Sequence, residues 1–258
     1  MGLRTAISTI FTLMSLATYQ QVIEALQLLS NSEKAKNSTR FFKTGKGQYG
    51  EGDVFMGVTM PEQRQLIKGF YHLPLPEIIH LLQQPEHECR MCALLLMVVQ
   101  YKKANAELQQ SIYQAYLQNT RRINNWDLVD ASAEHIVGAW LNGRKEKRTV
   151  LEQLARSDNL WERRIAMLST FYDIKKGQSA DALHLAKLLL HDSQDLMHKA
   201  VGWMLREIGK RCSISEEEAF LRKHYLQMPG TMLRYAIEHF PETKRQAYLT
   251  GKIAPDEN

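Results

Sequence analysis

The chain has 258 residues, of which 44% are hydrophobic, and it carries a formal net charge of +5. This composition is sufficient for a globular core and excludes an intrinsically disordered chain, and the basic balance suggests a polyanionic partner. Its three cysteines, an odd number, argue against a disulfide framework and indicate a reducing compartment, so we expect a cytoplasmic protein. Cys89 and Cys92 lie in an apolar helical run without a second pair to complete a zinc site, which predicts buried helix cysteines.

The N-terminal stretch permits more than one interpretation. Arg4 precedes the mostly apolar run Ala6–Leu16, and Ser15–Ala17 completes a likeness to a short secretory signal. Met14 also offers an alternative start. A first helix over residues 8–29 agrees better with a basic, cysteine-poor chain, and no apolar run is long enough to cross a membrane.

An irregular Gly-rich segment follows at about residues 40–58. Three of its glycines match the pattern GxGxxG, but no strand precedes them, no helix follows immediately, and the GK[ST] of a phosphate-binding P-loop is absent. The segment is either a loop that closes the first helical hairpin or a loop whose backbone amides bind phosphate together with Lys43 and Lys46.

Helical periodicity continues almost without interruption after residue 60. First-turn prolines, Asn and Ser caps and a Lys-Lys-Gly terminus support the element boundaries. The sequence therefore predicts an all-α protein whose residues 1–258 form a single domain without an internal linker. The expected helices are 61–72, 76–82, 87–102, 106–118, 126–141, 147–155, 160–175, 180–190, 194–211, 215–227, 231–239 and 242–248.

Three short motifs recur at nearly equal intervals, and they begin at Asn125, Leu160 and Lys199. Trp126 and Arg164 are 38 positions apart, and Arg164 and Trp203 are 39 apart. A period near 40 is typical of stacked helical hairpins, which return each inner helix to one wall. The spacing predicts an α-solenoid of antiparallel helix pairs.

The motifs bring together residues that suit the stabilisation of a positive charge. Trp126 and Asp130 are four apart and share a helix face. A carboxylate beside an aromatic ring can stabilise the oxocarbenium-like sugar that forms when a glycosidic bond breaks. Arg164 would hold a phosphate, and Trp203 would add a second aromatic wall. The alternative is that both Trp side chains fill the core and Asp130 caps or pairs at the surface.

No His, Cys or second acid lies in register with these residues, so no metal site, serine-type triad or cofactor is expected. We interpret Glu162 and Glu207 as partners that hold neighbouring arginine side chains in place, and not as acids.

The order Trp-Asp-x-Val-Asp, Trp-x-x-Arg-x-Ala and Lys-Ala-x-Gly-Trp-x-Leu-Arg-Glu resembles the AlkD-type family of HEAT-like-repeat alkylpurine DNA glycosylases. The resemblance covers about residues 55–240. It implies a C-shaped, right-handed stack of HEAT-like helix pairs whose basic concave face holds duplex DNA containing alkylated bases. It also implies release of cationic N3- or N7-alkylated purines without drawing the base into a pocket, in contrast to base-flipping enzymes.

Matched position by position, Trp126, Asp130 and Trp203 correspond to the family's catalytic residues, and Arg164 corresponds to its backbone-binding arginine. We place Arg206, from the third motif, among the DNA-binding residues with Lys43 and Lys46. We further expect the protein to be a monomer and to have no membrane partner.

The N-terminal part departs from the family. Active members place a well-formed helix early in the chain against the duplex, whereas residues 32–53 here predict one brief helical stretch and the Gly-rich loop. The alternative function is therefore a non-catalytic HEAT-repeat module that binds DNA or protein.

Overall fold

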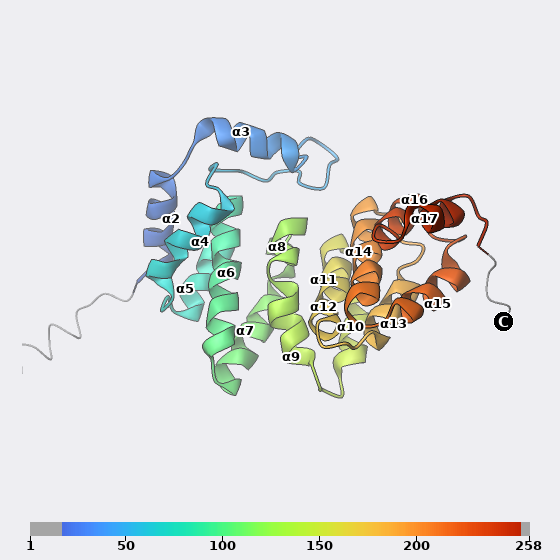
Figure 1. Ribbon diagram of the computed structural model, residues 1–258. Helices are drawn as coiled ribbons and strands as arrows, with labels where there is room; N and C mark the ends of the chain where they lie inside the picture. Colours follow the sequence, from blue (N-terminus) through green and yellow to red (C-terminus); the bar gives the residue numbers. More distant parts are fainter. Residues whose placement is uncertain (1–16, 254–258) are drawn as a thin grey trace, which may run out of the picture. The chain divides into compact units, whose positions relative to one another are not determined.

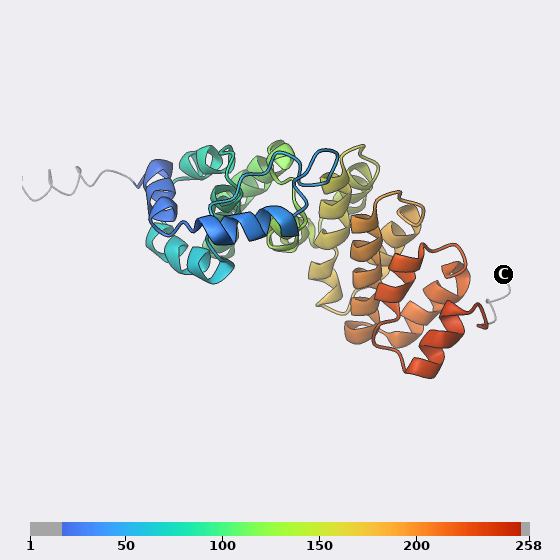
Figure 2. The same ribbon diagram turned by 90° about the horizontal axis from the view of Figure 1, so that it is seen from above.

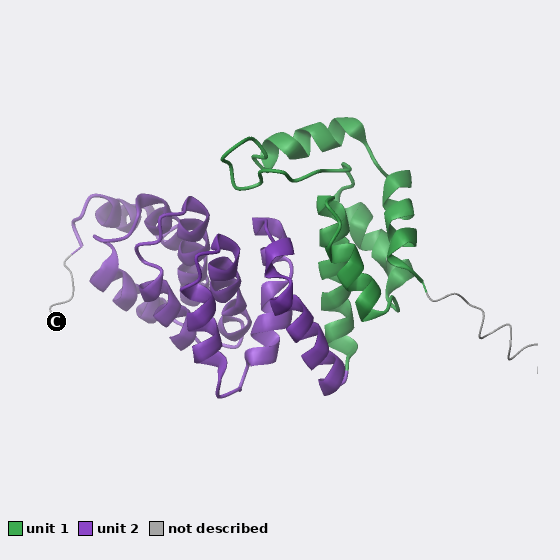
Figure 3. Ribbon diagram, turned by 180° about the vertical axis from the view of Figure 1, so that it is seen from behind, with its two compact units in different colours: residues 1–104 green, residues 105–258 purple. Residues whose placement is uncertain are grey.

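A computed structural model of the chain describes residues 17–253. This part is helical throughout, with one isolated bridge between Val54 and Glu86 as its only β-pairing. The prediction of an all-α fold built from successive helices is confirmed. The signal-like stretch lies, except for Ala17, outside the described residues. The chain divides into two compact units, residues 1–104 and residues 105–258, which are described in turn (Figure 3).

The first unit consists of short helices around α6, which is buried along most of its length (Figure 1). α5 and α6 pack against each other, and α2 packs on both. The elements are α2 (Tyr19–Leu28), α3 (Ser32–Phe41), α4 (Met60–Leu66) with a 3₁₀ turn (Ile67–Phe70), α5 (Leu75–Leu82) and α6 (His87–Lys103).

α3 is the element that the sequence indicates least clearly. Asn31 caps it by accepting the backbone N–H groups of Glu33 and Lys34, yet none of its ten residues is buried. Its residues are mostly polar, so it lacks the apolar stripe by which a core-facing helix is recognised in a sequence. The expectation of one brief helical stretch therefore underestimates a helix of nearly three turns.

The N-terminus of α6 anchors the extended segment 53–58 that follows the Gly-rich loop. The buried Glu88 carboxylate accepts three successive backbone N–H groups, from residues 56, 57 and 58, at 2.9, 2.8 and 3.3 Å. The Arg90 guanidinium donates to Asp53 at 2.7 Å, and both side chains are buried. Backbone hydrogen bonds from Asn31 to the Met56 carbonyl and from His87 to the Val54 carbonyl also hold the segment, so charged groups of α6 and neighbouring backbone fix its path together.

The second unit is a succession of packed helices, and its inner helices stand side by side in both views (Figures 1 and 2). α8 packs on α11, α11 on α14, and α14 on α16. The elements are α7 (Ala106–Gln118), a 3₁₀ turn (Thr120–Arg122), α8 (Trp126–Asp130), a π-helical turn (Glu134–Gly138), α9 (Ala139–Leu141), α10 (Lys147–Ala155), α11 (Leu160–Ser169), α12 (Phe171–Ile174), α13 (Ala180–Leu188), α14 (Asp195–Arg211), α15 (Ile214–His224), α16 (Gly230–Ala236) and α17 (Glu242–Leu249).

Two of the expected long helices are interrupted. The helix expected over residues 126–141 consists of α8, the π-helical turn and α9, and the helix expected over residues 160–175 divides at Thr170 into α11 and α12. Tertiary packing accompanies the first interruption, because a Cβ atom at Gly138 would lie 2.3 Å from the carbonyl oxygen of Ser169. Such close approach between neighbouring repeats is invisible to a periodicity argument.

Several local predictions are confirmed. Asn159 and Ser213 cap α11 and α15 with their side chains, and the Lys-Lys-Gly terminus ends at Gly177 with a φ of 77°. Cys89 and Cys92 are buried in α6, and burial raises the pKa of the Cys89 thiol to about 12. No helix within residues 17–253 is both long and apolar enough to span a bilayer.

Glu217 of α15 is a fully buried carboxyl group facing α14. A Cβ atom at Gly209 would lie 1.8 Å from the Glu217 carboxylate, so a larger residue there would displace that group, and His239 Nε2 lies 3.4 Å from the same carboxyl group. Burial raises the pKa of Glu217 to about 9, against the opposing effect of Lys244, Lys210 and Arg206. Glu217 is therefore protonated in the folded protein at neutral pH.

We expect the Glu217→Gln variant to weaken the pH dependence of stability. The unfolded chain ionises Glu217 above its ordinary pKa of about 4.3, whereas the folded chain keeps the proton until about pH 9. This group's stabilising contribution is therefore complete below pH 4 and falls by up to about 1.4 kcal/mol per pH unit until the folded pKa is reached. Urea unfolding of both proteins between pH 5 and pH 9 measures the difference. Parallel stability curves would show that Glu217 is ionised in the folded state.

Candidate active site

The short helix α8 places Trp126 and Asp130 at its two ends. Asn125, fully buried, accepts the backbone N–H of Trp126 at 2.8 Å. Leu128 and Val129 are buried on the inner side of the helix. The helix is therefore anchored by its middle, and this leaves Trp126 and Asp130 only partly covered.

Asp130 forms a bidentate ion pair with Arg164 of the neighbouring repeat. Nε of Arg164 donates to Oδ1 of Asp130 at 2.9 Å, and Nη2 donates to Oδ2 at 2.8 Å. The Arg164 side chain is 5% exposed, whereas the Asp130 side chain is 19% exposed. The guanidinium is thus enclosed, and the Asp130 side chain is partly exposed.

The same guanidinium also reaches α14. Nη1 of Arg164 donates to the backbone carbonyl of Leu196 at 2.6 Å. Arg164 therefore connects α8, α11 and α14, the three inner helices that carry the sequence motifs. Three of its five N–H groups are used in these bonds.

The electrostatic environment of Asp130 contains two opposing effects. Burial raises the pKa of the Asp130 carboxyl group above its ordinary value, while the charge and the hydrogen bonds of Arg164 lower it. A carboxylate in this position is poorly hydrated but held in a fixed orientation. That combination suits the stabilisation of a developing positive charge.

Trp203 of α14 lies beside an aromatic ring that the sequence interpretation did not identify. Its ring centroid is 5.7 Å from that of Phe171, with an interplanar angle of 57°. Lys175 Nζ lies 4.4 Å from the Phe171 ring centroid and donates to both carboxylate oxygens of Glu134 at 2.7 and 2.8 Å. Trp203 and Phe171 of α12 thus form one aromatic surface. The sequence pattern did not single out Phe171, because it lies within an ordinary helical run.

The other expected DNA-binding residues lie in two local settings. Arg206 contacts Glu238 and lies 3.7 Å from Glu207, and its side chain is 18% exposed. Lys43 and Lys46 belong to the first unit, where both are exposed in the Gly-rich loop.

Within that loop, side-chain oxygens already accept two backbone amides. The N–H of Gly45 donates to Gln48 at 3.0 Å, and the N–H of Gly47 donates to Glu51 at 2.7 Å. A phosphate at these two amides would have to displace Gln48 and Glu51. The exposed side chains of Lys43 and Lys46 are therefore the groups that the loop offers directly.

The expectation that Glu162 holds an arginine is wrong. Its two carboxylate oxygens accept the hydroxyl groups of Thr120 and Ser157, each at 2.6 Å. Glu207 does bind an arginine, because it accepts Nε of Arg211 at 2.7 Å. Both glutamates have an arginine next to them in the sequence, so adjacency could not distinguish them. Glu162 instead accepts hydrogen bonds from residues that precede α11 in the chain.

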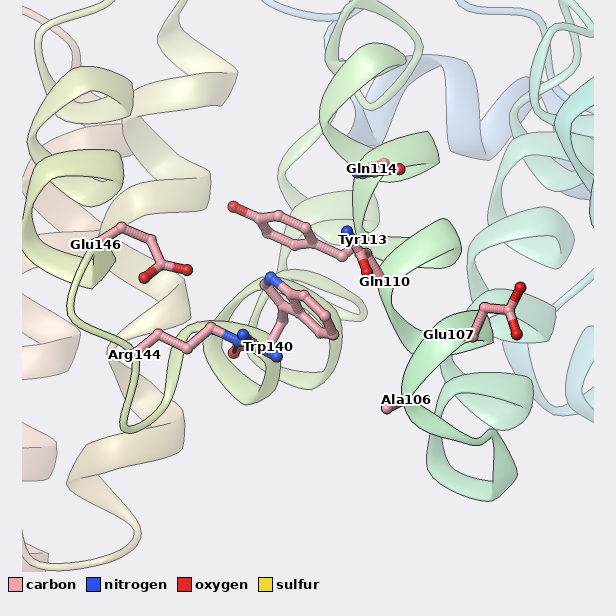
Figure 4. A pocket seen from close by; sticks show the side chains of 8 residues that line it. All are labelled: Ala106, Glu107, Gln110, Tyr113, Gln114, Trp140, Arg144 and Glu146. Atoms are coloured by element: carbon pink, nitrogen blue, oxygen red, sulfur yellow. Dashed lines mark hydrogen bonds between the residues drawn. The ribbon is translucent and has the colours of Figure 1, made fainter.

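A separate cavity of about 600 Å³ lies between α7 and the segment from α9 to α10 (Figure 4). Tyr113 stacks on Trp140 with ring centroids 5.4 Å apart, and the Arg144 guanidinium lies 3.6 Å from the Trp140 ring centroid. None of the residues around Asp130 lines this cavity. Within residues 17–253, no group of three His, Cys, Asp or Glu side chains is placed to hold a metal ion.

Comparison with known proteins relates the chain to DNA repair. A family model described as "DNA alkylation repair enzyme" matches residues 22–240. A solved structure described as a "Predicted DNA alkylation repair enzyme from Enterococcus faecalis" aligns with a TM-score of 0.66 and 21% sequence identity, and the match covers 83% of this chain and 97% of that one. At this identity the similarity shows a shared fold. No curated protein matches the chain.

We expect Arg164→Gln to destabilise the protein by about 3 kcal/mol, because it leaves a partly buried carboxylate without its cation. Urea unfolding at pH 7 measures the loss. Arg148→Gln is the matched control, since Arg148 pairs with Asp181 at 2.9 Å but its side chain is 53% exposed. That change should cost no more than about 1 kcal/mol. Equal losses in the two variants would contradict a special role for the Asp130–Arg164 pair.

Proposed function

Because this chain belongs to the DNA alkylation repair enzyme family, we propose that it is a DNA N-glycosylase. Its substrates are cationic N3- or N7-alkylated purines in duplex DNA, and its reaction is hydrolysis of the bond between base and deoxyribose. The observation that carries the proposal is the Asp130 carboxylate, held by Arg164 through two hydrogen bonds and partly exposed on the helix that also carries Trp126.

Asp130 supplies the negative charge that the reaction needs. As the glycosidic bond breaks, positive charge develops on the deoxyribose, and a fixed carboxylate in a poorly hydrated site stabilises that charge more than it stabilises the ground state. Asp130 also orients the attacking water. Trp126 and Trp203 complement the cation with their aromatic faces.

Arg164 has a positioning role in this proposal. Two of its N–H groups orient the carboxylate and a third is bound to Leu196, and the side chain is only 5% exposed, so we assign Arg164 to holding Asp130 in place and not to direct contact with a DNA phosphate. Lys43, Lys46 and Arg206 are the proposed phosphate contacts. No resident cofactor is part of the proposal, and the protein acts as a monomer.

The second candidate function is a non-catalytic DNA-binding or scaffold module. The observation that favours it is the engagement of both oxygens of Asp130 by Arg164, since a carboxylate that only joins two repeats would look the same. Release of methylated purines from alkylated duplex DNA distinguishes the two functions.

We expect Asp130→Asn to reduce excision by about 10²–10³-fold, because it removes one well-placed charge from the transition state, and to leave duplex affinity nearly unchanged. Single-turnover release of 7-methylguanine and a duplex-binding titration measure the two effects. Asp127→Asn is the matched control, because it removes the same charge from the same helix, α8, and should keep most of the activity. Wild-type turnover in the Asp130 variant would refute the catalytic assignment.

We also expect selectivity for bases that are already cationic. Asp127 is a second carboxylate near Asp130 on α8, but its Oδ1 accepts the backbone N–H of Leu128, so we assign it no role in protonating a neutral leaving base. N3-methyladenine and N7-methylguanine should therefore be released, whereas uracil, hypoxanthine and 8-oxoguanine should remain in the DNA. Chromatography of the bases freed from matched duplexes tests this. Efficient excision of uracil would overturn the mechanism.

A further inference from the structure

We propose that Glu162 is a positioning residue, which sets the place of Trp126 through Thr120. This inference rests on the function proposed above, in which Trp126 faces the reacting sugar. Arg164 fixes Asp130 at the C-terminal end of α8, and Glu162, two residues earlier on α11, fixes the chain that leads into the N-terminal end of α8.

The contact itself is short and enclosed. Thr120 Oγ1 donates to Glu162 Oε1 at 2.6 Å, and Ser157 Oγ donates to Oε2 at 2.6 Å. Thr120 is 5% exposed. Hydrogen bonds from hydroxyl groups to a carboxylate are shorter and stronger than those between neutral groups, so this contact defines a position closely.

The chain between Thr120 and Trp126 transmits that position. Thr120 opens the 3₁₀ turn 120–122, and the N–H of Ile123 donates back to the Thr120 carbonyl at 3.0 Å. Five residues separate Thr120 from Trp126, and two of them, Ile123 and Asn125, are fully buried. Asn125 also caps Trp126. So short and constrained a segment passes a displacement of Thr120 on to the start of α8.

α11 thus holds the neighbouring repeats with three consecutive side chains. Glu162 holds the segment before α8, and Arg163 holds Asp192 before α14 through Nε at 2.7 Å. Arg164 holds Asp130 and the start of α14. Glu162 also lies in the first turn of α11, where the partial positive charge of the helix N-terminus favours a carboxylate.

Thr120→Val is the sharpest test, because it removes the hydroxyl group and keeps the shape of the side chain. We expect single-turnover release of 7-methylguanine to slow by about 10- to 100-fold, the range expected when a reacting group is displaced by a fraction of an ångström to an ångström. Duplex affinity should be unchanged. Thr120→Ser restores the hydroxyl group and should restore the rate.

Ser179→Ala is the matched control. Ser179 is also a buried residue whose hydroxyl donates to a glutamate of another helix, Glu216 of α15, away from α8. Thermal unfolding compares the stability of the variants, and Ser179→Ala should keep the wild-type rate. If it slows excision as much as Thr120→Val at a similar loss of stability, the positioning role is refuted.

A readout independent of activity separates this inference from the proposed function. The four indole N–H signals, from Trp126, Trp140, Trp161 and Trp203, are assigned in an NMR spectrum by single Trp→Phe changes. Thr120→Val should shift or broaden the Trp126 signal and leave those of Trp140 and Trp203 in place. If the wild-type protein releases no base, the proposed function fails and this spectrum alone decides the positioning role. An unchanged Trp126 signal overturns it.

Discussion

A guanidinium group that is almost completely enclosed must have its N–H groups accepted by protein atoms, and this constraint on Arg164 organises the second unit. Two of the groups go to Asp130 and one to the carbonyl of Leu196, so the charge can be buried only when α8 and the start of α14 are both in place. Leaving a buried charge without its partner is among the more costly defects in a protein. Burial of the Arg164 charge therefore depends on α8, α11 and the start of α14 being in register.

The same arrangement resolves a conflict at the proposed centre. A carboxylate stabilises a nearby cation best where water is scarce, but burial also raises its pKa and favours the neutral acid. Arg164 opposes that rise, and the Asp130 side chain stays partly exposed. Trp126 is placed by a different contact, between Thr120 and Glu162, so two neighbouring positions on α11 serve the two ends of α8.

Apolar periodicity predicted the helices whose faces are buried, and it predicted α7 and α10 with their observed bounds. It could not predict the full length of α3, which buries nothing, or the interruption of the helix over residues 126–141, where the backbone of a neighbouring repeat approaches Gly138. The spacing of the motifs placed Asp130 and Arg164 on adjacent repeats. It gave no information about the Leu196 carbonyl, because a backbone acceptor has no signature in the sequence.

The cost of the Asp130–Arg164 pair bears on the choice between an enzyme and a scaffold. A buried ion pair is seldom more stabilising than apolar side chains of similar volume, because the desolvation of both charges offsets their attraction. A stack of helices that only had to hold together would be served as well by leucine and methionine at these positions. Keeping a poorly hydrated carboxylate partly exposed on the same helix as Trp126 is useful where a positive charge must be stabilised. Its partial exposure therefore favours catalysis over scaffolding as the role of Asp130, and the proposed reaction requires that exposed part of the side chain and not the ion pair itself.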